Sequence, residues 1–456
     1  MGLADEGTAR QRMEFLGAAV LLVWGLFQFV FFAYRIAGGI FPDEPEHFIV
    51  VLSWMKHPGF FLSNVEETLQ FGQVSARPPL FYALFGLLSG LSPENGSMNQ
   101  LVLLRIFNAA LTGLNVFYVY RLARETLATP TARILALGVV TNVLMFCFMG
   151  GALNYDGLNN LLCTAGIFYL FRGLRHERPV DLAKWALCLG LAGLTKITAL
   201  PVFLLSALIA GGWLARRPIS GRRFVAELRA RPGILAATLV VLTAFAAFHG
   251  GNLVRYQRLF PGCAEVLGHD FCREHSYVYR SSLRGKASNE NARRMAFLPF
   301  AGEYHKVFRA TLLGALGHRA IDRPQVFRFL KILAALSVLG AWGLRSAFRE
   351  PAWHVAWSLA ALTLGFYGVL VVQNYSTYLA SGSFGLALQA RYFFPMMSAF
   401  AVFAAGLWAN AIANVARWLR FPRLNEIGLS LVLAGGAYES FGYFLRHVDP
   451  SWFFQR

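Results

Sequence analysis

Four ionisable side chains lie within five residues near the N-terminus, in the segment Phe41–Phe48: Asp43, Glu44, Glu46 and His47. Carboxylates beside an imidazole can accept and donate protons, so this segment is a candidate for acid–base chemistry. The same residues fit a helix start, with Asp43 as N-cap and Glu46 completing a capping box. Capping does not exclude chemistry, because a capping carboxylate is fixed in place and because Glu44 and His47 are not needed for a cap.

A second acidic motif, Asn154-Tyr155-Asp156-Gly157, follows an apolar stretch that begins near Thr131. A lone Asp at a helix end is also common as a turn or cap residue. Three cations occur elsewhere beside proline, apolar or aromatic residues: Arg77 in Arg77-Pro78-Pro79, Lys196 in a long apolar run, and Arg391 in Gln389-Ala390-Arg391-Tyr392. Each arginine alone can be an interfacial anchor. Together, the three cations predict a cradle for a phosphate group.

The composition indicates that a membrane positions these residues. Hydrophobic residues make up 56% of the chain and charged residues 14%, and the mean hydropathy is +0.48, all outside the soluble average. Several runs approach the roughly 20 apolar residues that cross a bilayer: Phe15–Tyr34, Gly233–Phe248, Trp353–Val372 and Tyr392–Trp408. We therefore expect an all-α, polytopic integral membrane protein, and exclude a soluble domain.

The distribution of Arg predicts the topology. The net charge is +18, and a Lys or Arg at the membrane centre costs at least about 2.5–3.5 kcal/mol, so these residues belong in loops. The basic clusters read as cytoplasmic are Arg10 and Arg12, Arg121–Arg133, Arg172–Lys184, Arg216–Arg231, Arg345–Arg349 and Arg417–Arg423. Fitting spans between them gives about eleven transmembrane helices. The first is uncleaved, the N-terminus is cytoplasmic, and the tail from Arg446 lies on the opposite face.

Two segments do not fit simple spans. The run Pro79–Leu91 is short for a crossing and is typical of a re-entrant or interfacial segment. The run Trp185–Leu214 is too long for one helix and carries Lys196 near its middle, so we expect a tight hairpin of short helices. The hairpin turn would place Lys196 near the outer surface, where its charge is solvated or paired.

We expect one transmembrane domain, 1–456, whose outer-face loops 37–101, 150–157 and 250–328 form the site. The last loop contains Cys263 and Cys272, which an oxidising compartment would allow to form a structural disulfide. His269 lies between them, but two Cys and one His are an incomplete zinc ligand set. Cys147, Cys163 and Cys188 lie in apolar stretches, where a free Cys packs as a small hydrophobe.

The order of these motifs resembles the GT-C membrane glycosyltransferases, which include protein O-mannosyltransferases, aminoarabinose transferases and oligosaccharyltransferase catalytic subunits. The resemblance spans most of the chain and is closest to a bacterial branch. The branch pattern is an acidic Asp-Glu-Pro-x-His-Phe after the first span, then Pro-Pro-Leu, Asn-x-Asp, a mid-chain Lys and a late Gln-x-Arg-Tyr. The matching positions are Asp43 to Phe48, Pro78 to Leu80, Asn154 to Asp156, Lys196, and Gln389 to Tyr392. Arg77 departs from the pattern, since related enzymes often carry His or Lys before the prolines.

This resemblance implies transfer of a sugar from a polyprenyl-phosphate donor to an acceptor hydroxyl, with inversion, at the periplasmic face of a bacterial inner membrane. It implies catalytic roles for Asp43, as general base, and for Glu44 and Asp156. The substrate-binding residues that it implies are Glu46, His47, Arg77, Asn154, Tyr155, Lys196, Gln389, Arg391 and Tyr392. The acceptor would be a glycan, lipid or protein, and the clustered acids and His could also bind a divalent metal, Mg or Mn, as some members of the family do and others do not.

Two other classes share the hydropathy. A transporter or flippase for a lipid-linked sugar would place its ionisable residues along a pathway through the membrane, whereas the acids here cluster at one face. A non-catalytic subunit could use the basic residues of the outer loop to bind an anionic partner. A nucleic acid partner is not expected on that face.

Overall fold

The computed structural model describes residues 2–59, 63–91, 96–288, 294–314, 326–382, 389–421 and 423–454. Within these residues the chain is helical, and its β-pairing is limited to two isolated bridges, Ile36 with Phe453 and Leu127 with Phe348. The first half of the chain forms α1 (Gly2–Arg35), α2 (Glu44–Lys56), α3 (Glu66–Leu69), α4 (Leu80–Ser89), α5 (Met98–Thr126), α6 (Pro130–Thr141), α7 (Leu144–Gly150), α8 (Asp156–Arg175), α9 (Pro179–Gly193) and α10 (Ala199–Arg216).

The second half continues with further long helices and several short ones. These are α11 (Gly221–Arg229), α12 (Pro232–Tyr256), α13 (Cys263–Leu267), α14 (His269–His275), α15 (Tyr277–Ser288), α16 (Phe297–Leu313), α17 (Val326–Ala341), η1 (Leu344–Ala347), α18 (Ala352–Ser381), η2 (Ala390–Met396), α19 (Met397–Trp418), α20 (Leu424–Ala437), the π-helical turn η3 (Tyr438–Gly442), α21 (Tyr443–His447) and η4 (Pro450–Trp452). The predicted all-α membrane fold is thereby confirmed.

Six of the described helices are long and apolar enough to cross a bilayer: α1 from Gln11, α5, α10, α12, α18, and α19 together with η2. Helices α6 and α7 pass the same test as a pair, but a break at Asn142 and Val143 bends them by 66°. Other helices, such as α9, are too short or too polar to count by length and composition alone. The chain is a multi-pass membrane protein, and the number of eleven spans stays a prediction.

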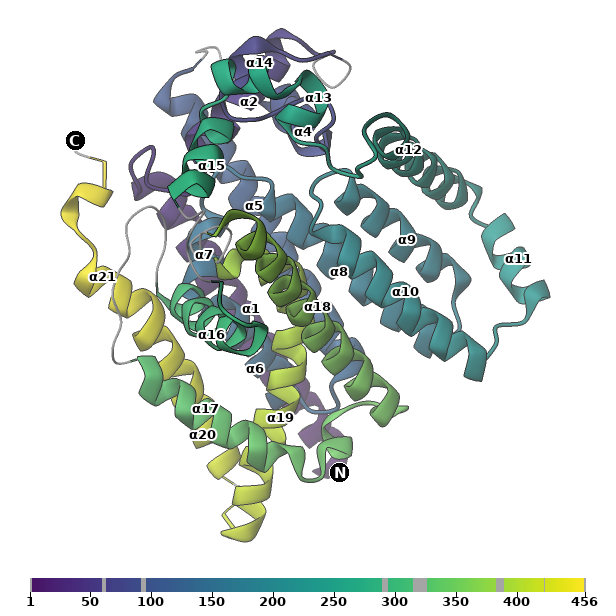
Figure 1. Cartoon of the computed structure of the whole chain (residues 1–456). Helices are drawn as coiled ribbons and strands as arrows, with labels where there is room; N and C mark the ends of the chain where they lie inside the picture. Colours follow the sequence, from purple (N-terminus) through teal and green to yellow (C-terminus); the bar gives the residue numbers. More distant parts are fainter. Residues whose placement is uncertain are drawn as a thin grey trace.

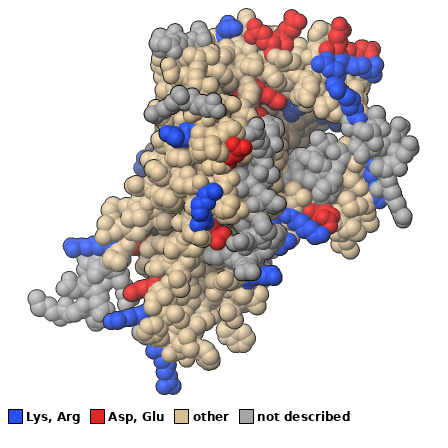
Figure 2. Space-filling view, turned by 90° about the vertical axis from the view of Figure 1, so that its left-hand side faces the viewer, with Lys and Arg blue, Asp and Glu red and all other residues tan. Residues whose placement is uncertain are grey.

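The long helices form one bundle whose two ends differ (Figure 1). Helices α1, α5, α6, α8 and α19 lie at its centre, α9, α10 and α12 form one flank, and α17 and α20 lie on the opposite side. Uncharged residues cover most of the face shown in Figure 2, and acidic residues gather at its top end. Charged side chains of both signs also occur across the middle of this face, between broad uncharged areas (Figure 2).

The lower end of the bundle holds the Arg-rich connections that were predicted to share one side. Arg133 Nη1 lies 2.7 Å from Glu14 Oε2, which joins the start of α6 to α1. Arg175 Nη2 donates to the carbonyl oxygen of Glu350 at 3.1 Å, and the backbone N–H of Arg349 donates to the carbonyl oxygen of Thr126 at 2.8 Å. Several basic loops therefore meet at the end where α1 begins.

The two segments that did not fit simple spans form a short helix and a hairpin. Helix α4 has ten residues and packs against α2 at the upper end of the bundle (Figure 1). Helices α9 and α10 form a hairpin whose turn, 194–198, contains Lys196. The two segments are joined, because the backbone N–H of Leu80 donates to the carbonyl oxygen of Leu194 at 3.0 Å.

The predicted outer loop 250–328 is mostly helical where it is described, and its residues 289–293 and 315–325 lie outside the described part. Helices α13, α14 and α15 form a small lobe at the upper end, closed by the predicted disulfide between Cys263 and Cys272. Helix α16 is different, because it packs in the bundle against α7 and η2. The free cysteines Cys147 and Cys163 are buried and Cys188 is partly buried, each in a helix.

Candidate active site

Asp43 lies at the N-cap position of α2, yet its side chain makes no capping hydrogen bond. The predicted helix start with Asp43 at the N-cap is therefore confirmed, but the capping hydrogen bond is absent. The residue has a left-handed backbone (φ 58°), and its carboxylate forms an ion pair with the guanidinium of Arg391 on η2. Burial raises the pKa of Asp43, but the charge and hydrogen bond of Arg391, together with the charge of Lys196, outweigh this effect and hold that pKa below its ordinary value.

Glu44 is not part of this ion pair, and its side chain is buried and makes contacts elsewhere in the protein. Its carboxylate forms a buried ion pair with Arg105 of α5 and accepts a hydrogen bond from the backbone N–H of Leu153 at 3.0 Å. Arg105 also donates to the carbonyl oxygens of Ala33 and Ile36, at 3.2 and 2.6 Å. Glu44 thus ties the end of α1, α5 and the turn before α8 together, which is the geometry of a structural residue.

The acid of the second motif is paired as well. Asp156 begins α8, and its Oδ1 lies 2.5 Å from Nζ of Lys196 in the α9–α10 turn. Asn154 fixes the turn, because its Oδ1 accepts a hydrogen bond from the backbone N–H of Asp156 at 2.7 Å. The ammonium of Lys196 also lies over the rings of Tyr155 and Tyr392, at 4.2 and 5.0 Å from their centres. Lys196 is therefore paired rather than solvated.

Tyr392 follows Arg391 directly, so the two ion pairs are neighbours. The guanidinium of Arg391 lies 5.3 Å from the centre of the Tyr392 ring, and the same ring faces Lys196 from 5.0 Å. Burial lowers the pKa of Lys196, but the charge of Asp156 opposes this effect and raises that pKa overall. Two carboxylates and two cations therefore form one electrostatic cluster at the upper end of the bundle.

The four side chains of this cluster differ in their exposure to solvent. The Asp43 side chain is 34% exposed, whereas those of Arg391, Lys196 and Asp156 are 5%, 5% and 2% exposed. Asp156 Oδ2 is buried and has no hydrogen-bond partner among the described residues. Asp43 is therefore the most exposed of the four side chains in this cluster.

His47 lies one helical turn after Asp43 on α2 and is buried. Its Nδ1 lies 2.9 Å from the hydroxyl of Tyr82 on α4, and its ring packs edge-on against Tyr155, with ring centres 4.5 Å apart. Burial lowers the pKa of His47 to about 4, with the Arg391 charge acting in the same direction. The imidazole is therefore neutral at physiological pH and forms part of the wall between α2 and α8.

Glu46 stands beside Asp43 and is half-buried. Burial and the Asp43 charge raise the pKa of Glu46 to about 7, although the Arg391 charge opposes this shift. Glu46 therefore titrates near neutral pH, unlike Asp43.

Arg77 and Gln389 lie at the edges of the cluster. The segment before Arg77 is held by Asn252 of α12, whose Nδ2 donates to the carbonyl oxygen of Ala76 at 3.0 Å. Arg77 Nε and Gln389 Oε1 are buried and have no hydrogen-bond partner among the described residues. The charge of Arg77 acts on the hydroxyl of Tyr82, whose pKa burial raises.

Sequence reasoning missed Arg105, Tyr82 and Asn252. A signal existed for Arg105, since a lone Arg inside an apolar run must find a partner. Tyr82 and Asn252 carry no such signal, because their positions depend on how α4 and α12 meet the rest of the bundle.

The described residues do not fit a divalent metal. None of their His, Cys, Asp and Glu side chains form a group of three or more that could hold a metal ion. The reason is local, since Asp43, Glu44 and Asp156 each face a different cation. These described side chains do not build a site for the divalent metal, Mg or Mn, that the resemblance left open.

Comparison with known proteins gives one family match. Residues 76–248 match the family of dolichyl-phosphate-mannose-protein mannosyltransferases, a range that includes Arg77, Asp156 and Lys196. No curated protein sequence matches the chain.

The fold is similar to solved membrane transferases. The archaeal oligosaccharyltransferase AglB from Archaeoglobus fulgidus, in complex with an inhibitory peptide and a dolichol-phosphate, is 11% identical with a TM-score of 0.51. The alignment covers 96% of this chain and 56% of that one, so the chain spans about half of AglB. ArnT from Cupriavidus metallidurans bound to undecaprenyl phosphate is 14% identical over 96% of this chain and 70% of that one, with a TM-score of 0.48. The family match and the shared helical fold confirm the resemblance to the GT-C superfamily of membrane glycosyltransferases that the sequence predicts.

Proposed function

We propose that the protein is a glycosyltransferase that moves a sugar from a polyprenyl-phosphate donor to an acceptor hydroxyl, with inversion at the anomeric carbon. The observation that carries this proposal is the pair of neighbouring acid–cation contacts, Asp43 with Arg391 and Asp156 with Lys196. Such a reaction requires a carboxylate for the acceptor proton and cations for the departing phosphate. The dolichol-phosphate in the AglB complex supports a donor of this class.

Asp43 is the general base in this proposal. It is the most exposed member of the cluster, and Arg391 keeps it ionised at neutral pH. The carboxylate takes the proton of the acceptor hydroxyl as the acceptor oxygen bonds to the anomeric carbon. The bond from that carbon to the phosphate oxygen breaks, and the polyprenyl phosphate leaves with the electron pair.

Asp156 orients the acceptor. Lys196 holds one carboxylate oxygen, and the other, Oδ2, has no hydrogen-bond partner among the described residues, so in this proposal it accepts a hydrogen bond from a second hydroxyl of the bound acceptor. Asn154 and Tyr155 fix the turn that carries this carboxylate. Glu44 has a structural role here, and Glu46 and His47 shape the wall around Asp43.

Arg77 is the principal phosphate ligand in this proposal. Lys196 and Arg391 each already face an aspartate, whereas Arg77 forms no ion pair among the described residues. The positive charges of Lys196 and Arg391 still assist the leaving phosphate. Gln389 and Tyr392 border the phosphate. The polyprenyl chain of the donor would lie along α12, because only 11% of its apolar stretch is buried inside the protein. Asn252 of the same helix holds the segment that carries Arg77.

The proposed setting is a bacterial inner membrane with the site on the periplasmic face. The acceptor is a glycan, lipid or protein hydroxyl.

A donor panel tests the proposal. Purified protein in lipid nanodiscs is incubated with radiolabelled polyprenyl-phosphate sugars, and released polyprenyl phosphate is measured. We expect turnover of one donor, and a higher KM for it in Arg77→Ala, because a charge-assisted contact is lost. Arg273→Ala, which removes an exposed cation of the α14 lobe, is the matched control. Movement of an intact lipid-linked sugar across vesicles without release would favour the transporter or flippase alternative.

A further inference from the structure

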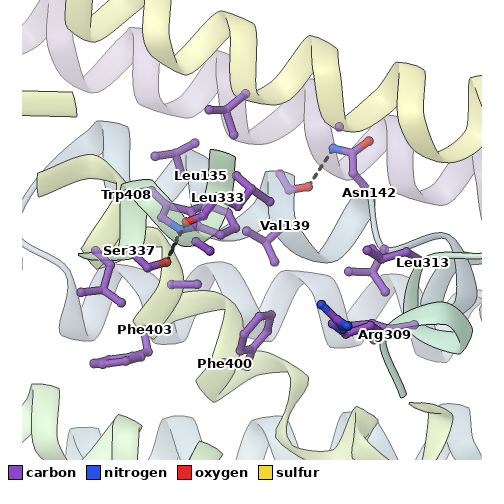
Figure 3. Close-up of a pocket in the computed structure, with 18 of the residues that line it drawn as sticks. Leu135, Val139, Asn142, Arg309, Leu313, Leu333, Ser337, Phe400, Phe403 and Trp408 are labelled. Atoms are coloured by element: carbon purple, nitrogen blue, oxygen red, sulfur yellow. Dashed lines mark hydrogen bonds between the residues drawn. The ribbon is translucent and has the colours of Figure 1, made fainter. Parts of the chain in front are cut away.

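The interior of the bundle is apolar in one place and polar in another. A cavity of about 500 Å³ between α6, α17 and α19 is lined mostly by apolar side chains and contains none of the candidate active-site residues (Figure 3). Its indole N–H is already satisfied, since Trp408 Nε1 donates to Ser337 Oγ at 2.9 Å. Beside the turn that carries Asp156 the interior is instead polar, because α5 places the fully buried Asn108 there.

Asn108 holds one peptide group of the turn between α7 and α8. Its Nδ2 donates to the carbonyl oxygen of Ala152 at 2.6 Å, and the N–H of the same peptide group, which belongs to Leu153, donates to Glu44 Oε1 at 3.0 Å. This peptide group is therefore held from both sides, by α5 and by the first residue of α2. Because a peptide group is planar and hydrogen bonds are directional, the two bonds together fix its orientation.

The amide of Asn108 also packs against the start of α8. A Cβ added at Gly157 would lie 2.2 Å from Asn108 Oδ1 and 2.9 Å from Nδ2, so glycine is needed for the amide to lie this close to the helix. The orientation of the amide is fixed, because the carbonyl oxygens of Gly150 and Ala152 lie 3.5 and 2.6 Å from Nδ2 and both require a donor. Asn108 therefore contacts the chain on both sides of Asp156.

The same contacts link Asn108 to Asp43. Glu44 follows Asp43 at the start of α2 and pairs with Arg105, which lies about one helical turn before Asn108 on α5. One stretch of α5 thus holds both the start of α2 and the turn that carries Asp156. A shift of either aspartate relative to the other would strain or break these contacts.

We propose that Asn108 is a positioning residue that sets the separation of Asp43 and Asp156. Its kinetic consequence rests on the proposed function, in which Asp43 is the base and Asp156 orients the acceptor. Without the amide of Asn108, the 152–153 peptide group loses one of its two anchors, and the turn that carries Asp156 moves relative to α2. A displacement of about 1 Å in an active site can cost roughly 100-fold in rate.

Hydrogen–deuterium exchange tests the hold on the turn without any turnover. We expect faster exchange in peptides that cover residues 150–157 of Asn108→Ala, because the N–H groups of Leu153 and Asp156 are then held less firmly. Asn115→Ala is the matched control, since Asn115 is also buried on α5 but lies about 10 Å further along the helix. Exchange of this segment that is no faster in Asn108→Ala than in Asn115→Ala would overturn the proposal.

The close approach to Gly157 gives a second test, which uses thermal unfolding. Gly157→Ala should lower the melting temperature of the wild type, because its Cβ overlaps the amide of Asn108. In the Asn108→Ala background the same change should cost much less, since the amide is gone. Equal losses in both backgrounds would contradict the contact on which the proposal depends.

Kinetics on the donor that the wild type turns over separate positioning from a general loss of structure. Asn108→Ala should lower kcat for release of polyprenyl phosphate by up to roughly 100-fold. The KM for the donor should not change, because Arg77 binds the donor in the proposed function. Asn108→Ala should lower kcat no further when Asp156→Asn is already present, since the carboxylate that Asn108 positions is then absent.

Additive losses in the double variant Asn108→Ala/Asp156→Asn would show that Asn108 does not act through Asp156. A wild-type protein that released no polyprenyl phosphate from any donor would refute the proposed function instead. The exchange and melting measurements would then still decide whether Asn108 holds the turn.

Discussion

Asp43 combines three features that rarely occur in one carboxylate: a left-handed backbone, an ion pair with a buried arginine and partial exposure. Asp and Asn are the residues that most readily adopt the left-handed conformation apart from Gly. The conformation is therefore compatible with either side chain. This compatibility makes Asn the most informative replacement.

We expect Asp43→Asn to lower donor turnover by roughly 10²–10⁴-fold, since general-base catalysis contributes about that much. Polyprenyl phosphate release measures the rate. Some stability should also be lost, because Arg391 then lies buried beside a neutral amide.

The double variant Asp43→Asn/Arg391→Gln separates these two effects. It removes the buried charge, so the melting temperature should recover while turnover does not. If Asp43→Asn turned over donor at the wild-type rate, the base would have to be sought at Glu46 or Asp156.

Glu46 gives a second prediction, based on pH. Its pKa is about 7 in the folded protein against an ordinary 4.5, so between these values the folded state keeps a proton that the unfolded chain has lost. The stability that Glu46 contributes must therefore fall as the pH rises from about 4.5 to 7. Glu46→Gln avoids this loss, and its gain in melting temperature should be small at pH 5 and larger at pH 8.

Thermal unfolding in detergent at both pH values measures this difference. Glu66→Gln, which removes an exposed carboxylate from the neighbouring helix α3, is the control. A gain for Glu46→Gln that is equal at pH 5 and pH 8 would show that burial of the charged carboxylate is not its cause.

At the scale of elements, the sequence predicted those features that depend on local pattern. The length of Trp185–Leu214 and the position of Lys196 within it indicated a hairpin, and α9 and α10 form one. The short run Pro79–Leu91 likewise predicted α4. The partner of each charge was not predictable, because Asp43 and Arg391 are 348 residues apart and meet only when η2 packs against α8 in the folded bundle. The pattern that suggested a capping carboxylate therefore predicted that Asp43 lies at the start of a helix, but not that it contacts Arg391.

The disulfide lobe gives a prediction at this scale. Cys263 and Cys272 pack in one apolar cluster with Leu69, Val74 and Ala76, directly before Arg77. The bond closes a loop over a sequence separation of 9 residues, which is worth roughly 2–3 kcal/mol in the chain-entropy model. Cys263→Ser/Cys272→Ser should raise the KM for the donor with little change in kcat, because the wall behind the Arg77 segment loosens.

Steady-state kinetics on the same donor checks this, with Cys188→Ser as the control for loss of a thiol elsewhere. A fall in kcat with an unchanged KM would show that the lobe acts on the chemical step rather than on donor binding.

The whole molecule is a bundle whose charged site and Arg-rich connections lie at opposite ends. Composition was sufficient to predict this class, because hydropathy and the Arg distribution are properties of the entire chain. The number of spans was not settled in the same way, since α6 and α7 are bent and α9 is short. Helices of that kind are stabilised by their neighbours and leave a weak signal in hydropathy.

Topology is the prediction that belongs to this scale. Single cysteines in place of the exposed His57 and Asp270 should react with an impermeant thiol reagent from outside, and one in place of Arg222 only from inside. The three free cysteines are first replaced by Ser. Labelling of His57→Cys and Arg222→Cys from the same side would contradict a site on the outer face.

Asp43 and Glu44 are adjacent at the start of α2, but their ion pairs, with Arg391 and Arg105, can form at different times during synthesis. Glu44 and Arg105 are 61 residues apart, so their contact becomes possible soon after the second long helix leaves the ribosome. Asp43 must wait for Arg391, 348 residues later. Nascent chains that end before η2 would therefore already hold α1, α2 and α5 together while Asp43, the proposed general base, lacks its counter-charge. On this basis the scaffold forms early in translation and the proposed site is completed late.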